Sequence, residues 1–304
     1  MLAAAALVAL SWGRLLLTGD APDAPGEILV GVSTGVILAT VAFVPFLLAV
    51  LLVVASPSRR SVAGGAALVY VVDLSLTVGQ ALPNSIPVGF VVLAVPLARV
   101  ATFLAVATAV WLAFHGGYDR LASAAGEADQ HPLFATVADR RIGPNLSLQR
   151  GLVAAGLAAL VGAGGLVLAG GVADLFRTVA RSGTGSAIVV FPRAQVWNVG
   201  IPPARLPREW LFEASFLLGV LFVAGPRLGS RDLLKGIAVV FGVQSAAALL
   251  PALVPPFRPV DLWAASGPLL SPLSDVVVLV GIAVAVRLAV HAGPGTLRRR
   301  PRLG

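Results

Sequence analysis

The chain has no cysteine, which excludes disulfide bonds and thiolate metal sites. It has a single lysine, Lys235, so arginine supplies nearly all of the positive charge. Arginine in place of lysine, together with abundant alanine, valine, leucine and glycine, is the bias of a GC-rich prokaryotic genome. We therefore expect a prokaryotic source.

Charged residues of both signs are scarce. They make up 12% of the chain, about half the share in a typical soluble domain, whereas 58% of the residues are hydrophobic. A mean hydropathy of +0.93 indicates that lipid is the solvent of this chain. In lipid, only helices and closed barrels satisfy their backbone hydrogen bonds, and the apolar runs far exceed the roughly 10-residue strands of barrels. The composition therefore predicts an all-α, polytopic transmembrane helix bundle.

Eight segments have the length and apolar character of membrane helices. Those at 28–55 and 86–114 exceed the roughly 20 residues of one straight crossing and contain Pro45 and Pro96, so we expect kinks or tilt in both. The first segment is the weakest, because Arg14 lies near its presumed outer end; seven crossings, with 1–17 at the membrane surface, is the alternative. The full set is 2–17, 28–55, 62–81, 86–114, 151–172, 210–226, 236–254 and 270–290.

These helices divide the chain into two membrane halves of four helices each. The predicted parts are a first half at 1–114, a cytoplasmic loop at 115–150, a second half at 151–290 with an outer loop at 173–209, and a basic cytoplasmic tail at 291–304. We expect a short helix at 118–130 in the first loop and a small hairpin at 186–199 in the second.

Two similar strings suggest that the halves are related. "LLAVL" at 47–51 and "LLGVL" at 217–221 each precede a basic turn and a further helix, as in a parallel four-plus-four repeat. Chance matches are also common in a chain so rich in leucine and valine, so the repeat and a chance match both stay open.

Basic residues are unevenly distributed between the connecting segments. Most of those outside the helices fall in 56–61, 115–150, 227–235 and 291–304, which alternation places on one side of the membrane. The positive-inside rule makes that side the cytoplasm, with both termini inside. The net charge of +8 is therefore a topology signal, and we expect a multi-pass protein of the plasma membrane that binds the lipid bilayer and no nucleic acid.

Asp73 is a carboxylate inside an apolar run, in "ALVYVVDLSLTVGQ" at 67–80. An isolated charge at the bilayer centre costs at least about 2.5–3.5 kcal/mol. Arg99 lies at a similar depth in the next helix, across the turn that contains Pro83 and Pro87. We predict that Asp73 and Arg99 form an ion pair. The pair either lines a polar pathway or only sets the helix register.

Four other polar residues lie in or near the apolar runs. Gln80 shares a helix face with Asp73, and Gln244, in the middle of 236–254, is expected to form an interhelical hydrogen bond. Glu213 and Asp275 lie near the outer ends of their helices, where they are candidates for a charged outer vestibule or are ordinary interface residues.

Other candidate sites are weak. His115, His131 and His291 are too scattered for a metal site, and "GTGS" at 183–186 lacks the lysine of a phosphate-binding loop. We expect no metal, no cofactor and no enzymatic activity, because no acid–base or nucleophile set is present.

The helix at 151–171 is crowded with glycine and alanine, whose small side chains let helix backbones approach closely. We expect it to be a central packing helix, with a homo-oligomer or partner seam as a further role. The function that these features favour is a transporter or permease-like subunit for a small solute or ion. The alternative is a non-catalytic membrane component that assembles or anchors partner proteins.

Overall fold

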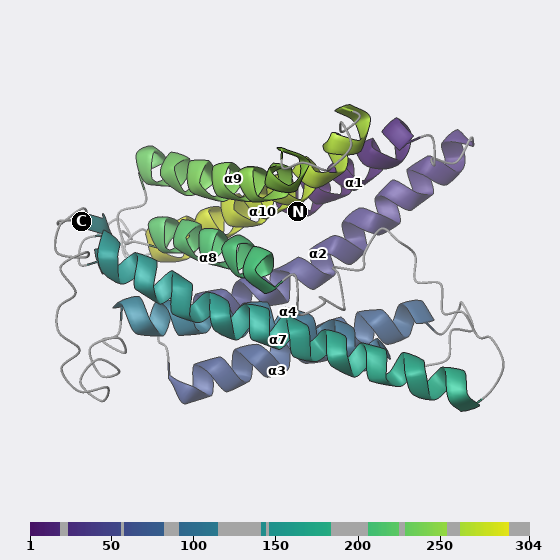
Figure 1. Cartoon of the computed structure of the whole chain (residues 1–304), viewed down its shortest axis with the longest axis horizontal. Helices are drawn as coiled ribbons and strands as arrows, with labels where there is room; N and C mark the ends of the chain where they lie inside the picture. Colours follow the sequence, from purple (N-terminus) through teal and green to yellow (C-terminus); the bar gives the residue numbers. More distant parts are fainter. Residues whose placement is uncertain are drawn as a thin grey trace, which may run out of the picture.

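The computed structural model describes residues 1–18, 24–55, 58–81, 91–114, 141–143, 146–183, 206–224, 229–253 and 262–291. Long helices dominate these residues and lie side by side along the longest axis of the molecule (Figure 1). The first half of the chain contributes α1 (Leu2–Thr18), α2 (Pro25–Ala55), α3 (Arg59–Ala81) and α4 (Val91–Phe114). The second half contributes α7 (Leu148–Gly183), α8 (Leu206–Val223), α9 (Ser230–Leu253) and α10 (Leu262–Val286), which continues into a π-helical turn, Arg287–His291.

Six of these helices are long and apolar enough to cross a membrane: α2, α3, α4, α7, α9 and α10. The apolar part of α1 is shorter, and α8 carries Arg208, Glu209 and Glu213 near its start. The predicted all-helical class, with apolar helices suited to a membrane, is therefore confirmed. The number of eight crossings and the cytoplasmic position of both termini stay predictions.

Two local differences from the sequence expectation concern the loops. Part of the expected outer loop at 173–209 is helical, because α7 continues to Gly183. The residues that follow 172 include alanine, leucine and arginine, which are good helix formers, and no proline up to Gly183, and glycine is a common residue at a helix end. Before α7, β1 (Arg141–Gly143) and β2 (Leu146–Ser147) pair antiparallel at the end of the expected cytoplasmic loop. The expected helix at 118–130 and hairpin at 186–199 lie outside the described residues.

Serine side chains define two of the helix starts. The Ser58 hydroxyl accepts a hydrogen bond from the backbone N–H of Ser61 at the start of α3. The Ser147 hydroxyl accepts one from the N–H of Arg150 at the start of α7. Such capping satisfies backbone donors that have no partner within the helix.

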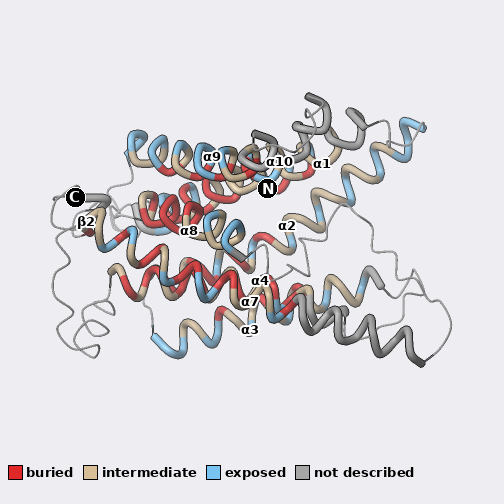
Figure 2. The backbone as a smooth tube through the Cα atoms, viewed as in Figure 1, coloured by how far each residue is buried: buried red, intermediate tan, exposed pale blue. Residues whose placement is uncertain are grey.

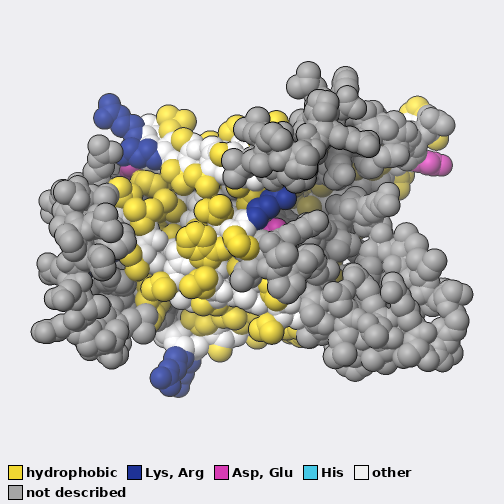
Figure 3. All heavy atoms as spheres, viewed as in Figure 1, with side chains coloured by type: hydrophobic (Ala, Val, Ile, Leu, Met, Phe, Trp, Pro, Cys, Tyr) yellow, Lys and Arg dark blue, Asp and Glu magenta, His cyan; other side chains and the backbone are white. Residues whose placement is uncertain are grey.

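The core runs along the middle of the bundle, and α4 and α8 contain many of its residues (Figure 2). Fully buried side chains include Phe103, Leu217, Leu221, Leu279 and Val50. The outward faces are also apolar, and hydrophobic side chains cover most of the described surface in the space-filling view (Figure 3). An exposed apolar surface of this extent requires lipid contact.

The glycine-rich helix α7 packs against α4 and α8, as the sequence predicts for a central packing helix. Gly165 lies against Ala101 of α4, and Gly162 lies against Ala105 of α4 and the carboxyl group of Glu213. The Trp210 indole N–H of α8 donates a hydrogen bond to the Gly156 carbonyl oxygen at 2.9 Å. The small residues of α7 therefore allow close helix packing within the chain.

Candidate functional site

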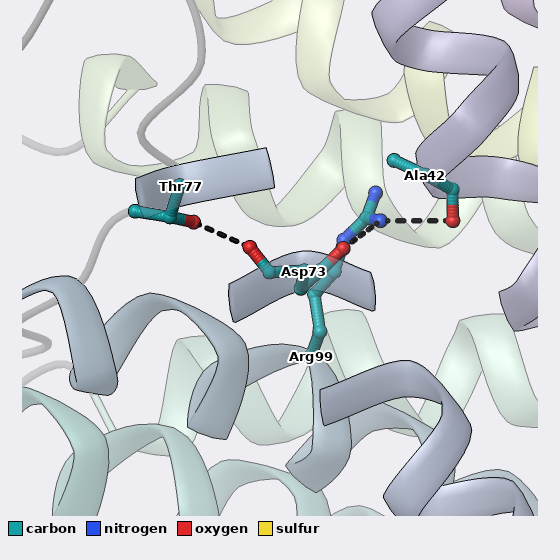
Figure 4. A network of polar contacts seen from close by, with 4 residues as sticks. All are labelled: Ala42, Asp73, Thr77 and Arg99. Atoms are coloured by element: carbon teal, nitrogen blue, oxygen red, sulfur yellow. Dashed lines mark hydrogen bonds and ion pairs between the residues drawn. The ribbon is translucent and has the colours of Figure 1, made fainter. Parts of the chain in front are cut away.

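The first polar cluster joins three helices of the first half. One guanidinium nitrogen of Arg99, Nη1, donates to Asp73 Oδ1 at 3.1 Å and to the Ala42 carbonyl oxygen of α2 at 3.3 Å (Figure 4). The Asp73 side chain is 8% exposed and that of Arg99 is 26% exposed. The ion pair predicted from the sequence is therefore present, with its acidic member buried and its basic member partly accessible.

The local sequence explains how this charge is accommodated. Asp73 lies in the apolar part of α3, where Thr77 donates its hydroxyl to the Asp73 carbonyl oxygen at 2.7 Å (Figure 4). A carboxylate in such a setting requires a charged partner, because burying an unpaired charge is costly. Among the described residues, Nη1 is the only nitrogen of the Arg99 side chain with a hydrogen bond. The other nitrogens of the guanidinium can donate to a further acceptor.

The second polar cluster joins three helices of the second half. Gln244 of α9 is fully buried, and its Nε2 donates to Asp275 Oδ2 of α10 at 2.8 Å and to the Phe212 carbonyl oxygen of α8 at 3.2 Å. The Ser215 hydroxyl donates to the same carbonyl oxygen at 2.9 Å. The interhelical hydrogen bond expected for Gln244 is therefore present, whereas its partner Asp275 was not predicted.

Several buried polar atoms of this region have no hydrogen-bond partner among the described residues: Glu213 Oε2, Gln244 Oε1 and Ser245 Oγ. Glu213 Oε2 is directed toward α7, where a Cβ added at Gly162 would lie 3.3 Å from it. The carboxyl groups of Asp275 and Glu209 are close enough to act electrostatically on Glu213. Glu213 thus has two other carboxyl groups in its neighbourhood and a buried oxygen without a partner among the described residues.

The remaining candidates are placed as follows. Gln80 belongs to the last turn of α3, and its side chain lies outside the described part. Most of the outer arginines that a charged vestibule requires also lie outside it, so that interpretation of Glu213 and Asp275 stays a prediction. The sequence contains a signal for the pairing of Gln244 with Asp275. Gln244 precedes Pro251 by as many residues as Asp275 follows Pro268, which predicts a similar depth in neighbouring helices.

Within the described ranges, no group of three or more histidine, aspartate or glutamate side chains is positioned to hold a metal ion. His115 and His131 lie outside these ranges, as does the side chain of His291. No protein-family model, curated protein or solved structure matches the chain. The helices and their buried polar clusters define the class of the protein: a helical, membrane-embedded protein with ionisable groups inside the bundle.

Proposed function

We propose that the chain is a transporter or permease-like subunit for a small solute or ion, with Asp73 and Arg99 in its pathway. The observation that carries the proposal is the partly exposed Arg99 side chain, which holds a buried carboxylate and has further donors without a partner among the described residues. Ionisable side chains inside membrane helices commonly mark solute or ion pathways. The proposed setting is the plasma membrane of a prokaryote, with eight crossings and both termini in the cytoplasm.

Water access along α3 tests this proposal. The natural chain lacks cysteine, so single cysteines can be placed at Thr77, one turn from Asp73, and at Val71 on an exposed face of the same helix. A membrane-impermeant thiol reagent is expected to label Thr77→Cys, because the pathway contains water. Val71→Cys is the matched control and is expected to stay unlabelled, because Val71 faces lipid.

Protection of both positions would contradict an aqueous pathway next to Asp73. Protection combined with stable co-purification of one membrane protein would instead support the assembly or anchoring alternative. In that case, the ion pair would serve only to fix how α2, α3 and α4 pack.

A further inference from the structure

The last helices of the two halves have closely similar sequences. "PLARVATFLAVATAVWLAFH" at 96–115 and "PLSDVVVLVGIAVAVRLAVH" at 272–291 align without a gap from Pro96 and Pro272 to His115 and His291. Likewise, "FLLAVL" at 46–51 in α2 matches "FLLGVL" at 216–221 in α8. Three features of the structure then test whether these matches reflect a duplication.

The first feature is the packing between the third and fourth helices of each half. Gly65 of α3 lies against the Phe103 ring of α4, and Gly236 of α9 lies against Leu279 of α10. Phe103 and Leu279 occupy the same position in the alignment of α4 with α10. An ungapped alignment of α3 with α9 that matches the two glycines also matches Asp73 with Gln244.

The second feature is the exchange of helices between the halves. The fourth helix of the first half, α4, packs on α7 and α8, which are the first two helices of the second half. The fourth helix of the second half, α10, packs on α1 and α2 in the same way. Two copies related by a two-fold axis produce this reciprocal contact pattern.

The third feature is the pair of polar clusters. In the first half, Arg99 of the fourth helix bonds to Asp73 of the third and to a carbonyl oxygen of the second. In the second half, Gln244 of the third helix bonds to Asp275 of the fourth and to a carbonyl oxygen of the second. Arg99 and Asp275 are aligned, so the second cluster has an acid where the first has its arginine.

The two halves differ in polarity at the position of Glu213, because the residue aligned with it in the first half is Phe43. Phe43 is 6% exposed and packs against Gly281 of α10, while Glu213 lies beside Gly162, which itself contacts Ala105 of α4. Ala105 and Gly281 are aligned as well. The first half therefore shows that an apolar ring suits this position, and that the fold does not require a carboxyl group there.

The described surroundings of the Glu213 carboxyl group include small and acidic groups from several helices. The carboxyl groups of Asp275 on α10 and Glu209 on α8 act electrostatically on it, and α7 places the uncharged Gly162 against it, with Ala105 of α4 next to that glycine. On α9, the uncharged Gln244 bonds to Asp275 and to the carbonyl oxygen of Phe212, the residue before Glu213. Arg208, also on α8, is positioned over the ring of Phe212. Burying a charged carboxylate oxygen without a partner, as for Glu213 Oε2 among the described residues, is costly, and binding one proton removes the charge.

We propose that the two halves are copies of one four-helix unit, and that the second copy carries a proton-binding carboxyl group, Glu213, beside Gln244 and Asp275. Gln244 Oε1 gives independent support, because this fully buried side chain keeps an acceptor without a partner among the described residues. The role of this proton in driving solute movement rests on the proposed transport function, whereas proton binding itself does not.

Infrared difference spectroscopy of the full-length protein in lipid nanodiscs tests the proposal. A pH jump is expected to give a protonated-carboxyl band in the natural protein, and this band should be lost in both Glu213→Gln and Glu213→Phe. Glu27→Gln, at the exposed start of α2, is the matched control and should keep the band. A band that persists in both Glu213 variants would overturn the proposal.

The Phe variant also tests the duplication. Because Phe43 fills the equivalent position, Glu213→Phe is expected to fold and to be at least as heat-stable as the natural protein. Failure of this variant to fold would contradict the equivalence of the two positions, and Glu213→Gln would then still decide the question of proton binding. Protection of Thr77→Cys from the thiol reagent would overturn the transport proposal without affecting the infrared band.

Discussion

Placing the charge of Asp73 or of Arg99 in lipid is unfavourable in free energy, and pairing the two opposite charges offsets part of that free energy. Arg99 reaches the Ala42 carbonyl oxygen as well as the carboxylate, so a single side chain links three helices. Removing one member of a buried ion pair leaves the other without its counter-charge, which costs about 3–5 kcal/mol when both are fully buried. Arg99 is 26% exposed, so a smaller loss applies here.

We predict that Asp73→Asn and Arg99→Gln each lower the free energy of unfolding by about 1–3 kcal/mol, measured by denaturant unfolding in detergent. The swapped variant Asp73→Arg/Arg99→Asp should recover most of this loss, because the opposite charges again meet between α3 and α4. Ser75→Ala is the control, since the Ser75 hydroxyl bonds only to the Val71 carbonyl oxygen on an exposed face of α3. A swapped variant less stable than both single variants would argue against a stabilising pair.

At the scale of the element, α7 of the second half forms a close contact with α4 of the first half. Its glycines permit close approach because a Cβ on Gly165 would collide with the Cβ of Ala101. Gly156, Gly162 and Gly165 are all engaged by side chains of the same chain. A homo-oligomer interface through 151–171 stays a prediction. In the single chain, these three glycines already pack against side chains of α4 and α8.

Two neighbouring glycines of α7 form a matched pair for a test. Gly165→Val should destabilise the protein by about 1–3 kcal/mol, because it overpacks the interface between α4 and α7. Gly164→Val introduces the same side chain where, among the described residues, a Cβ would meet no atom of another helix within 4 Å, and it should be close to neutral. Thermal unfolding of the two variants in detergent provides the comparison, and equal losses would show that the contact with Ala101 is unimportant.

At the scale of the whole molecule, the bundle has apolar side chains both inside and outside. Leu168, Leu234 and Leu288 are more than 60% exposed, and they belong to an extended apolar surface of the kind that lipid covers. The helices extend broadly along the longest axis of the molecule, with α2 and α7 tilted in opposite senses (Figure 1). The arginine distribution predicts the side of the membrane on which each connection lies.

This orientation is testable in intact cells with exposed single-cysteine positions. Ala24→Cys, between α1 and α2, should react with an impermeant thiol reagent added from outside. Ser58→Cys and Ser230→Cys, before α3 and α9, should react only after the cells are permeabilised. Labelling of Ala24→Cys only after permeabilisation would contradict eight crossings and support the surface position of residues 1–17.

The sequence predicted the helical class and the approximate positions of the long helices, because lipid requires every backbone group to bond within its own segment. It also predicted the pairing of Asp73 with Arg99, since equal depth in neighbouring helices leaves few other partners. The sequence did not predict the pairing of Gln244 with Asp275, because a carboxyl group near the outer end of a helix can also be solvated by water or lipid headgroups. The extension of α7 to Gly183 was missed because apolar character ends well before helical structure does.

The sequence alone therefore determined that lipid surrounds this protein, where its long helices lie, and that charged residues occur within them. All three follow from hydropathy and local helix geometry. Only the tertiary structure decided that Glu213 faces Gly162, that Gln244 bonds to Asp275, and that α4 and α10 exchange partners between the halves. Such contacts join residues far apart in the chain, and they depend on how helices rotate and pack against one another.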